Sequence, residues 1–87
     1  MTTYAVQRTL TGITMDQLAG AQKAAIACSA AMSAEGTSVR YIRSNFYPAT
    51  SRCTCLFEAA SADDVRQVNE KASLPYDRIE EVLDLHP

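Results

Sequence analysis

The sequence predicts an α+β fold with the element order strand, helix, strand, strand, helix, strand. Three observations support this order: an alternating stretch opens the chain, a long alanine-rich stretch follows it, and two β-rich stretches joined by "PATS" precede a second helical stretch. A period of two is typical of strands, and apolar steps of three and four are typical of helices. Because 47% of the residues are apolar and we find no linker or repeat, we expect residues 1–87 to form one domain.

The first strand is predicted over residues 3–9, where "TYAVQRT" alternates in strand fashion. The first helix is predicted over residues 15–35, because alanine is the best helix former and Thr14 offers an oxygen as N-cap. Gly36 should end this helix in a left-handed conformation. The apolar positions that share one face of the helix are Leu18, Ala21, Ala25, Cys28 and Met32.

The middle of the chain predicts a β-hairpin. Residues 38–47 and 52–59 are rich in strand formers, and the stretch between them carries turn residues. A second helix should then begin after Ser61, which can act as N-cap, and close at Leu74-Pro75. The inner face of this helix is expected to consist of Val65, Val68 and Ala72.

The last strand is predicted within residues 77–87, with apolar positions at Ile79, Val82, Leu83 and Leu85. The complete order is that of the ferredoxin-like plait, in which both helices cover the same face of a four-stranded antiparallel sheet. The other sheet face is then left open, and burying it against a second copy is the economical solution. We therefore expect a homodimer in which the two sheets face each other, a dimeric α+β barrel.

Composition and charge argue against several classes of protein. The net charge is only −2 and the basic residues are scattered, whereas a nucleic-acid-binding protein would show a basic face. No stretch has the character of a signal peptide or a membrane span, so we expect no membrane partner. Three cysteines without such a signal favour a cytoplasmic protein with reduced thiols.

Residues 55–82, "CLFEAASADDVRQVNEKASLPYDRIEEV", resemble the signature half of a family of small bacterial proteins whose namesake is an actinobacterial nickel-binding protein. The first half of the chain also fits, so the resemblance covers nearly the whole chain. It implies a ferredoxin-like dimer, with nickel or another divalent metal as the cofactor. The residues that carry the pattern are Cys55, Leu56, Phe57, Glu58 and Ala59, followed after the helix by Leu74, Pro75, Asp77, Arg78 and Ile79.

The chain departs from this family pattern at positions that bear on metal binding. Val68 and Arg43 stand where the family has histidine, and Gln7 stands where it commonly has glutamate. These replacements remove the imidazole and carboxylate groups that suit nickel. The resemblance therefore implies the fold more strongly than it implies nickel.

Cys53 and Cys55 have three interpretations. Side chains two positions apart in a strand point to the same face, so the two thiolates can share one soft metal ion, with His86 as a further ligand. They can instead act as redox-active or nucleophilic thiols. They can also be small core residues that carry sulfur. The sequence leaves these alternatives open.

Arg43 is the centre of a predicted small-molecule site. If the hairpin turns over residues 47–51, Arg43 lies opposite or nearly opposite Cys55, where a cation would favour the thiolate. Polar and aromatic neighbours would then surround an apolar ligand, although the aromatic residues could equally fill a dimer interface. Alternatively, Arg43 faces solvent on its strand or forms a salt bridge across a dimer. The expected ligand-binding residues are Arg43, Tyr41, Asn45, Gln7 and Phe57.

Three functions fit these observations. The first is a small homodimeric ligand-binding protein. The second is a cofactor-independent enzyme of the isomerase or monooxygenase type, by analogy of fold alone. The third is a non-catalytic accessory or interaction module. The sequence contains no HExxH, CxxC, GxSxG or glycine-rich phosphate loop, so binding is favoured over catalysis.

Overall fold

The computed structural model describes residues 1–85 and 87, and it confirms the predicted order of elements. In chain order these are β1 (Thr2–Thr9), α1 (Met15–Ala34), β2 (Val39–Tyr47), β3 (Arg52–Ala59), α2 (Ala62–Lys71) and β4 (Arg78–Val82). The strands form one antiparallel sheet in the order β2-β3-β1-β4. This is the ferredoxin-like arrangement.

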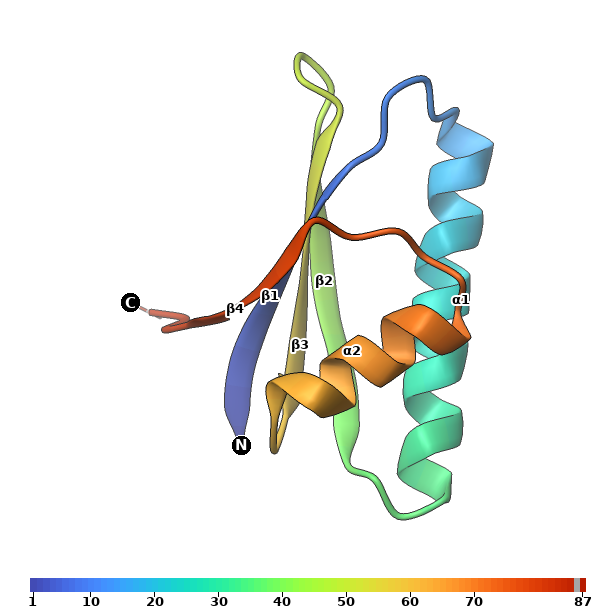
Figure 1. Ribbon diagram of the computed structural model, residues 1–87. Helices are drawn as coiled ribbons and strands as arrows, with labels where there is room; N and C mark the ends of the chain where they lie inside the picture. The colour runs from blue at the N-terminus through green and yellow to red at the C-terminus, as the bar shows by residue number, and fades with distance from the viewer. Residues whose placement is uncertain (86) are drawn as a thin grey trace.

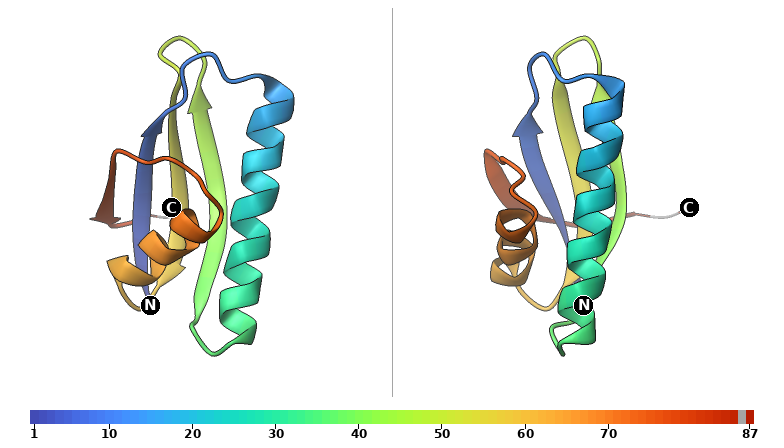
Figure 2. Two further views of the ribbon diagram at one scale, coloured as in Figure 1. Left: turned by 45° about the vertical axis from the view of Figure 1, so that its right-hand side comes forward. Right: turned by 90° about the vertical axis from the view of Figure 1, so that its right-hand side faces the viewer.

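Both helices lie on the same side of the sheet, and the opposite face carries no helix (Figure 1). The long helix α1 runs along the β2 side, while the shorter α2 crosses the sheet next to it (Figure 2). We call these two sides the helix face and the open face. In the part of the chain that the structure describes, no helix is both long and apolar enough to cross a membrane.

The ends of α1 follow the predicted capping chemistry. The Thr14 side chain accepts a hydrogen bond from the Gln17 amide, and the Gln17 side chain accepts one from the Thr14 amide, which completes a capping box. At the other end Gly36 has φ +101°, and the amide of Thr37 donates to the carbonyl of Met32. This left-handed turn satisfies carbonyl groups that the helix leaves free.

Helix α2 ends earlier than Leu74-Pro75, at Lys71. Ser73 takes the left-handed conformation, with φ +57°, and the amide of Leu74 donates to the carbonyl of Asn69. The helix therefore ends in the same kind of turn as α1, although a serine takes the place that glycine usually holds. At its start, Ser61 caps the helix as predicted.

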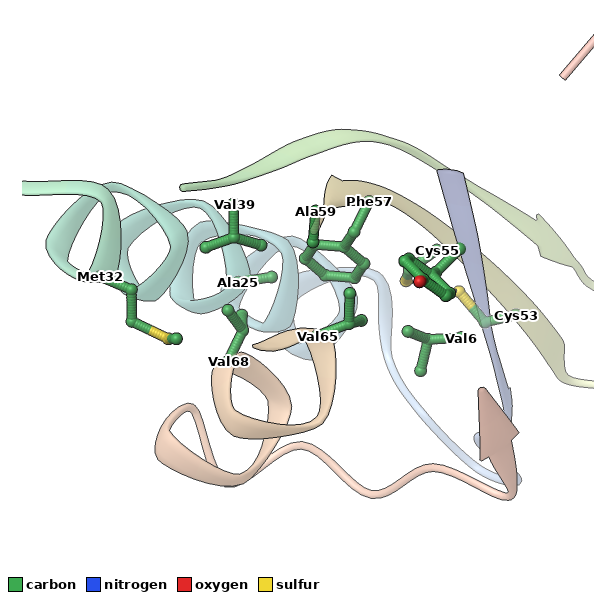
Figure 3. Packing of buried hydrophobic residues seen from close by; sticks show 11 residues of the cluster. Val6, Ala25, Met32, Val39, Cys53, Cys55, Phe57, Ala59, Val65 and Val68 are labelled. Carbon is green, nitrogen blue, oxygen red and sulfur yellow. Dashed lines mark hydrogen bonds between the residues drawn. The ribbon is translucent and has the colours of Figure 1, made fainter. Parts of the chain in front are cut away.

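The core lies between the helix face and the two helices. Figure 3 shows the cluster, which extends from Met32 on α1 to Cys53 and Cys55 on β3, with Phe57 between them. Val65 and Val68 of α2 pack into it as predicted, and both are fully buried. The buried hydrophobic residues of the strands are Tyr4, Ala5, Val6, Val39, Cys53, Cys55, Phe57 and Ala59.

Two parts of the predicted core differ in the structure. Of the five apolar positions predicted for the inner face of α1, only Ala25 and Met32 are buried, and Leu18 and Ala21 are half-buried because they border a cavity. The polar residue Ser29 is also buried on this helix. Leu83 and Leu85 follow β4 instead of belonging to it, and they are 83% and 86% exposed. After β4 the chain runs away from the sheet on the side opposite the helices (Figure 1).

Candidate functional site

A cavity of about 200 Å³ lies between the first half of α1 and the helix face of the sheet. Its apolar lining includes Leu18, Ala21, Ala25, Phe46 and Leu74. Its polar lining comes from three strands and from α1: Arg8, Gln22, Tyr41, Ser44, Cys53 and Cys55. The cavity therefore combines an apolar helix wall with a sheet floor that carries reactive and charged groups.

Cys53 and Cys55 lie side by side on this floor. The alternation of β3 points both side chains to the helix face, where they are 2% and 6% exposed. Their sulfur atoms are 3.8 Å apart and form no disulfide. Figure 3 shows them at one end of the core cluster, opposite Met32. Both thiols are therefore core residues that also border a cavity.

A chain of hydrogen bonds leads across the cavity wall to Cys55. Gln22 Nε2 donates to Tyr41 Oη at 3.1 Å, Tyr41 Oη and Ser44 Oγ are 2.6 Å apart, and Ser44 Oγ donates to Cys55 Sγ at 2.9 Å. Because Ser44 gives its only hydrogen to the sulfur, it must accept from the Tyr41 hydroxyl. Every bond in the chain therefore points the same way, and Cys55 is the terminal acceptor.

Arg8 is a buried cation next to the thiols. It is 4% exposed, and its Cα is paired with that of Cys53 across β1 and β3. Its guanidinium donates to Asn69 Oδ1 at 2.8 Å and to the carbonyl of Pro75 at 3.1 Å. Within residues 1–85 and 87, no carboxylate forms an ion pair with Arg8. A buried charge without a counter-ion is costly, so this site favours a negative charge nearby.

That negative charge belongs on Cys55. The pKa of the Cys55 thiol is lowered, first by the hydrogen bond from Cys53 and then by the charge of Arg8 and the hydrogen bond from Ser44, which together outweigh burial. The pKa of Cys53 is raised by its hydrogen bond to Cys55, by burial and by the charge on Cys55. Both directions favour the proton on Cys53 and the thiolate on Cys55.

The predicted contact between Arg43 and Cys55 is wrong. The pairing of β2 with β3 shifts between Tyr41 and Arg43, so Arg43 lies opposite Leu56 and Ser44 lies opposite Cys55. This β-bulge at Ile42 adds one residue to β2 and exchanges the two faces of the strand beyond it. Arg43 is consequently on the open face, where it donates to Asp84 Oδ1 at 3.3 Å.

The other predicted ligand-binding residues divide between the two faces. Tyr41 lines the cavity and makes an edge-to-face contact with Phe57, with ring centroids 5.5 Å apart. Gln7 is paired with Thr54 across β1 and β3 and accepts its hydroxyl hydrogen at 2.8 Å, and Asn45 is paired with Thr54 from the β2 side. Since Thr54 lies between Cys53 and Cys55, this group is on the open face.

The structure assigns the cavity three polar residues that the sequence reasoning missed: Arg8, Gln22 and Ser44. Arg8 carried a usable signal, because it follows Tyr4 and Val6 at steps of two and therefore shares their buried face. Ser44 carried none, since the bulge that turns it inward depends on pairing with β3.

The predicted metal site has little support in the described residues. His86 lies outside them. In residues 1–85 and 87, no three side chains of His, Cys, Asp or Glu come together in a way that could hold a metal ion. Val68, where the family pattern has histidine, is fully buried in the core. Cys53 and Cys55 are thus explained here as thiols of the cavity floor.

Comparison with known proteins places the chain in a family. The family model described as "Nickel responsive protein SCO4226-like" matches residues 4–82. The chain belongs to this SCO4226-like family. The resemblance expected from the sequence is thereby confirmed.

A solved member of this family supports the fold. The crystal structure of SCO4226 from Streptomyces coelicolor A3(2) is similar to this chain with a TM-score of 0.80 and 30% sequence identity. The similarity covers 95% of this chain and 99% of that chain. No curated protein matches the chain.

Proposed function

We propose that the protein binds a small, mainly apolar molecule in the cavity between α1 and the sheet. The observation that carries this proposal is the cavity itself, with about 200 Å³ of space beside a buried cation and two thiols. A dry apolar cavity of about 150 Å³ is enough to bind benzene. The ligand is therefore a molecule somewhat larger than a single aromatic ring.

The cavity gives such a ligand both an entrance and an orientation. Met15 is 74% exposed and borders the cavity together with the exposed residues Ala19 and Gln22, so the entrance lies along the outer edge of α1. The polar groups are concentrated on the sheet floor. A ligand would direct its polar end towards Tyr41 and Arg8 and its hydrocarbon part towards α1, as is usual for small-molecule sites.

Filling the cavity tests this proposal. Ala21→Phe places a ring in the cavity, whereas Ala27→Phe adds the same ring at an exposed position of α1 that does not line it. We use benzylacetone as the probe and follow amide shifts by NMR. Saturable shifts along α1 and β3 in wild type and Ala27→Phe, but not in Ala21→Phe, support the proposal. Their absence from the wild type contradicts it.

The proposed molecule is a single-domain homodimer joined through the open face. This face holds a groove of about 460 Å³ lined by apolar residues, among them Ile42, Val82, Leu83 and Leu85, and by charged residues of both signs, Arg40, Arg43, Glu58 and Asp84. Exposed leucines next to mixed charges suit a contact between identical surfaces. The three free thiols fit the cytoplasm, where thiols stay reduced.

Nickel is the second candidate ligand, favoured by membership of a family described as nickel responsive. The described residues of one chain do not assemble a site for it, so its ligands would have to include His86, which lies outside them, or groups from a second copy. Native mass spectrometry with added Ni²⁺ tests this candidate. Bound nickel in stoichiometric amount supports it, and a protein without bound nickel contradicts it.

A further inference from the structure

We infer that Cys55 is the nucleophile of a covalent capture site for small apolar α,β-unsaturated ketones and aldehydes, an inference that rests on the proposed binding role of the cavity. Three features of the structure lead to it. They are the convergence of hydrogen-bond donors on one sulfur, the exposure of that sulfur to an apolar cavity, and a second thiol placed to complete the reaction.

The donors around Cys55 prepare its sulfur to attack. Ser44 Oγ donates at 2.9 Å and the Cys53 thiol lies at 3.8 Å, while the guanidinium of Arg8 supplies a nearby positive charge. The thiolate is the nucleophilic form of cysteine, and donors with a cation stabilise it. The Cys53 thiol lies close enough to Cys55 to hold the proton of the pair, so the site needs no separate base.

The lining of the cavity restricts the class of electrophile. The thiolate is a soft nucleophile, and a polarised carbon–carbon double bond is a soft electrophile. Such a double bond therefore reacts with the thiolate rather than with water. The carbonyl oxygen of such a compound can accept a hydrogen bond from Arg8, which lines the cavity and has more N–H groups than its bonds to Asn69 and Pro75 use. Its hydrocarbon end then contacts Leu18, Ala21 and Phe46, which are apolar lining residues.

The step balances without any co-reactant. The sulfur of Cys55 forms a bond to the β-carbon, and the electron pair of the double bond moves onto the α-carbon and carbonyl oxygen as an enolate. The Cys53 thiol, 3.8 Å from Cys55, gives its proton to the α-carbon. Cys53 becomes the thiolate as Cys55 becomes a thioether, so the site has one negative charge before and after, next to Arg8.

The test uses benzylideneacetone, an unsaturated ketone of suitable size, with the full-length protein. Adducts are counted by intact mass spectrometry and located by peptide mapping in the wild type, Cys55→Ser and Cys28→Ser. Cys28 is the matched control because it is a half-buried thiol of α1 that does not line the cavity. We expect one adduct on Cys55, formed roughly tenfold or more faster than on Cys28, since each unit of pKa lowering gives up to tenfold more thiolate.

A second pair of measurements separates this inference from the proposed function. Benzylacetone has nearly the same shape but lacks the double bond, so it reports binding alone. If benzylacetone occupies the cavity while benzylideneacetone labels Cys55 no faster than Cys28, the capture role is overturned and the binding role stands. If neither compound enters the cavity, both are overturned. Since Cys55→Ser could fail to fold, Ala21→Phe serves as an independent variant and should slow labelling, whereas Ala27→Phe should not.

Discussion

Ser44 Oγ lies 2.9 Å from Cys55 Sγ and donates its hydroxyl hydrogen to the sulfur. The two residues are directly paired across β2 and β3, and this pairing exists because of the bulge at Ile42. A hydroxyl that donates to a sulfur stabilises the thiolate more than the thiol. The backbone irregularity of β2 thus has a direct effect on the chemistry of β3.

Removing this hydroxyl should raise the pKa of Cys55. We expect Ser44→Ala to raise it by about one unit, because a hydrogen bond to a charged group contributes about 1.5–3 kcal/mol. Only the thiolate is alkylated. Because the pKa of Cys55 is lowered, its alkylation in the wild type should stay fast at a pH below the usual pKa of cysteine. The rate at which iodoacetamide labels Cys55 is measured as a function of pH, and the midpoint of this curve gives the pKa. Ser38→Ala, an exposed change, is the control, and an unshifted midpoint in Ser44→Ala would count against the donor role.

Substitutions of Arg8 should raise the pKa of Cys55 by different amounts. Arg8→Met removes the charge and should raise the pKa of Cys55, whereas Arg8→Lys keeps a charge and should raise it less. Both variants lose a guanidinium contact to Asn69 and should lower the urea midpoint of unfolding. If the pKa of Cys55 is the same in Arg8→Met and Arg8→Lys, the charge of Arg8 has no effect on it.

The left-handed residues at the helix ends predict opposite changes in stability. Ser73→Gly should stabilise the protein by about 1 kcal/mol, because φ +57° is unfavourable for a residue with a Cβ. Gly36→Ala should destabilise it by about 1 kcal/mol or more, since φ +101° is harder still for such a residue. Urea denaturation at fixed protein concentration measures both. Equal signs for the two changes would refute this account of the helix ends.

The homodimer proposal predicts that the leucines after β4 control association. Replacing Leu83 and Leu85 together by serine should produce a monomer, because their exposed apolar surface would no longer be buried between two copies. Sedimentation equilibrium measures the mass in solution. Ile26→Ser, which alters an exposed apolar residue on α1, should leave the dimer intact. A wild type that is monomeric at every concentration would rule out the proposal.

The fold was predictable because its signals are local. Thr14 and Gly36 marked the ends of α1, and the alternation of β3 placed Cys53 and Cys55 on one face as predicted. The candidate site was less predictable, because it depends on pairing between strands. Simple alternation predicts that Arg43 is the next residue after Tyr41 to face the cavity, but because of the bulge this residue is Ser44. Arg8 follows from the alternation of β1, because it lies two positions after the buried Val6.

The bulge at Ile42 also links the two surfaces of the molecule in their evolution. If β2 kept Ile42 but lost the bulge, the sides of the strand beyond it would be exchanged, so Arg43 and Asn45 would enter the cavity while Ser44 and Phe46 would turn outward. A point substitution alters one surface at a time, whereas loss of the bulge would change both together. The bulge is therefore inherited as a joint specification of what the cavity holds and what the open face meets.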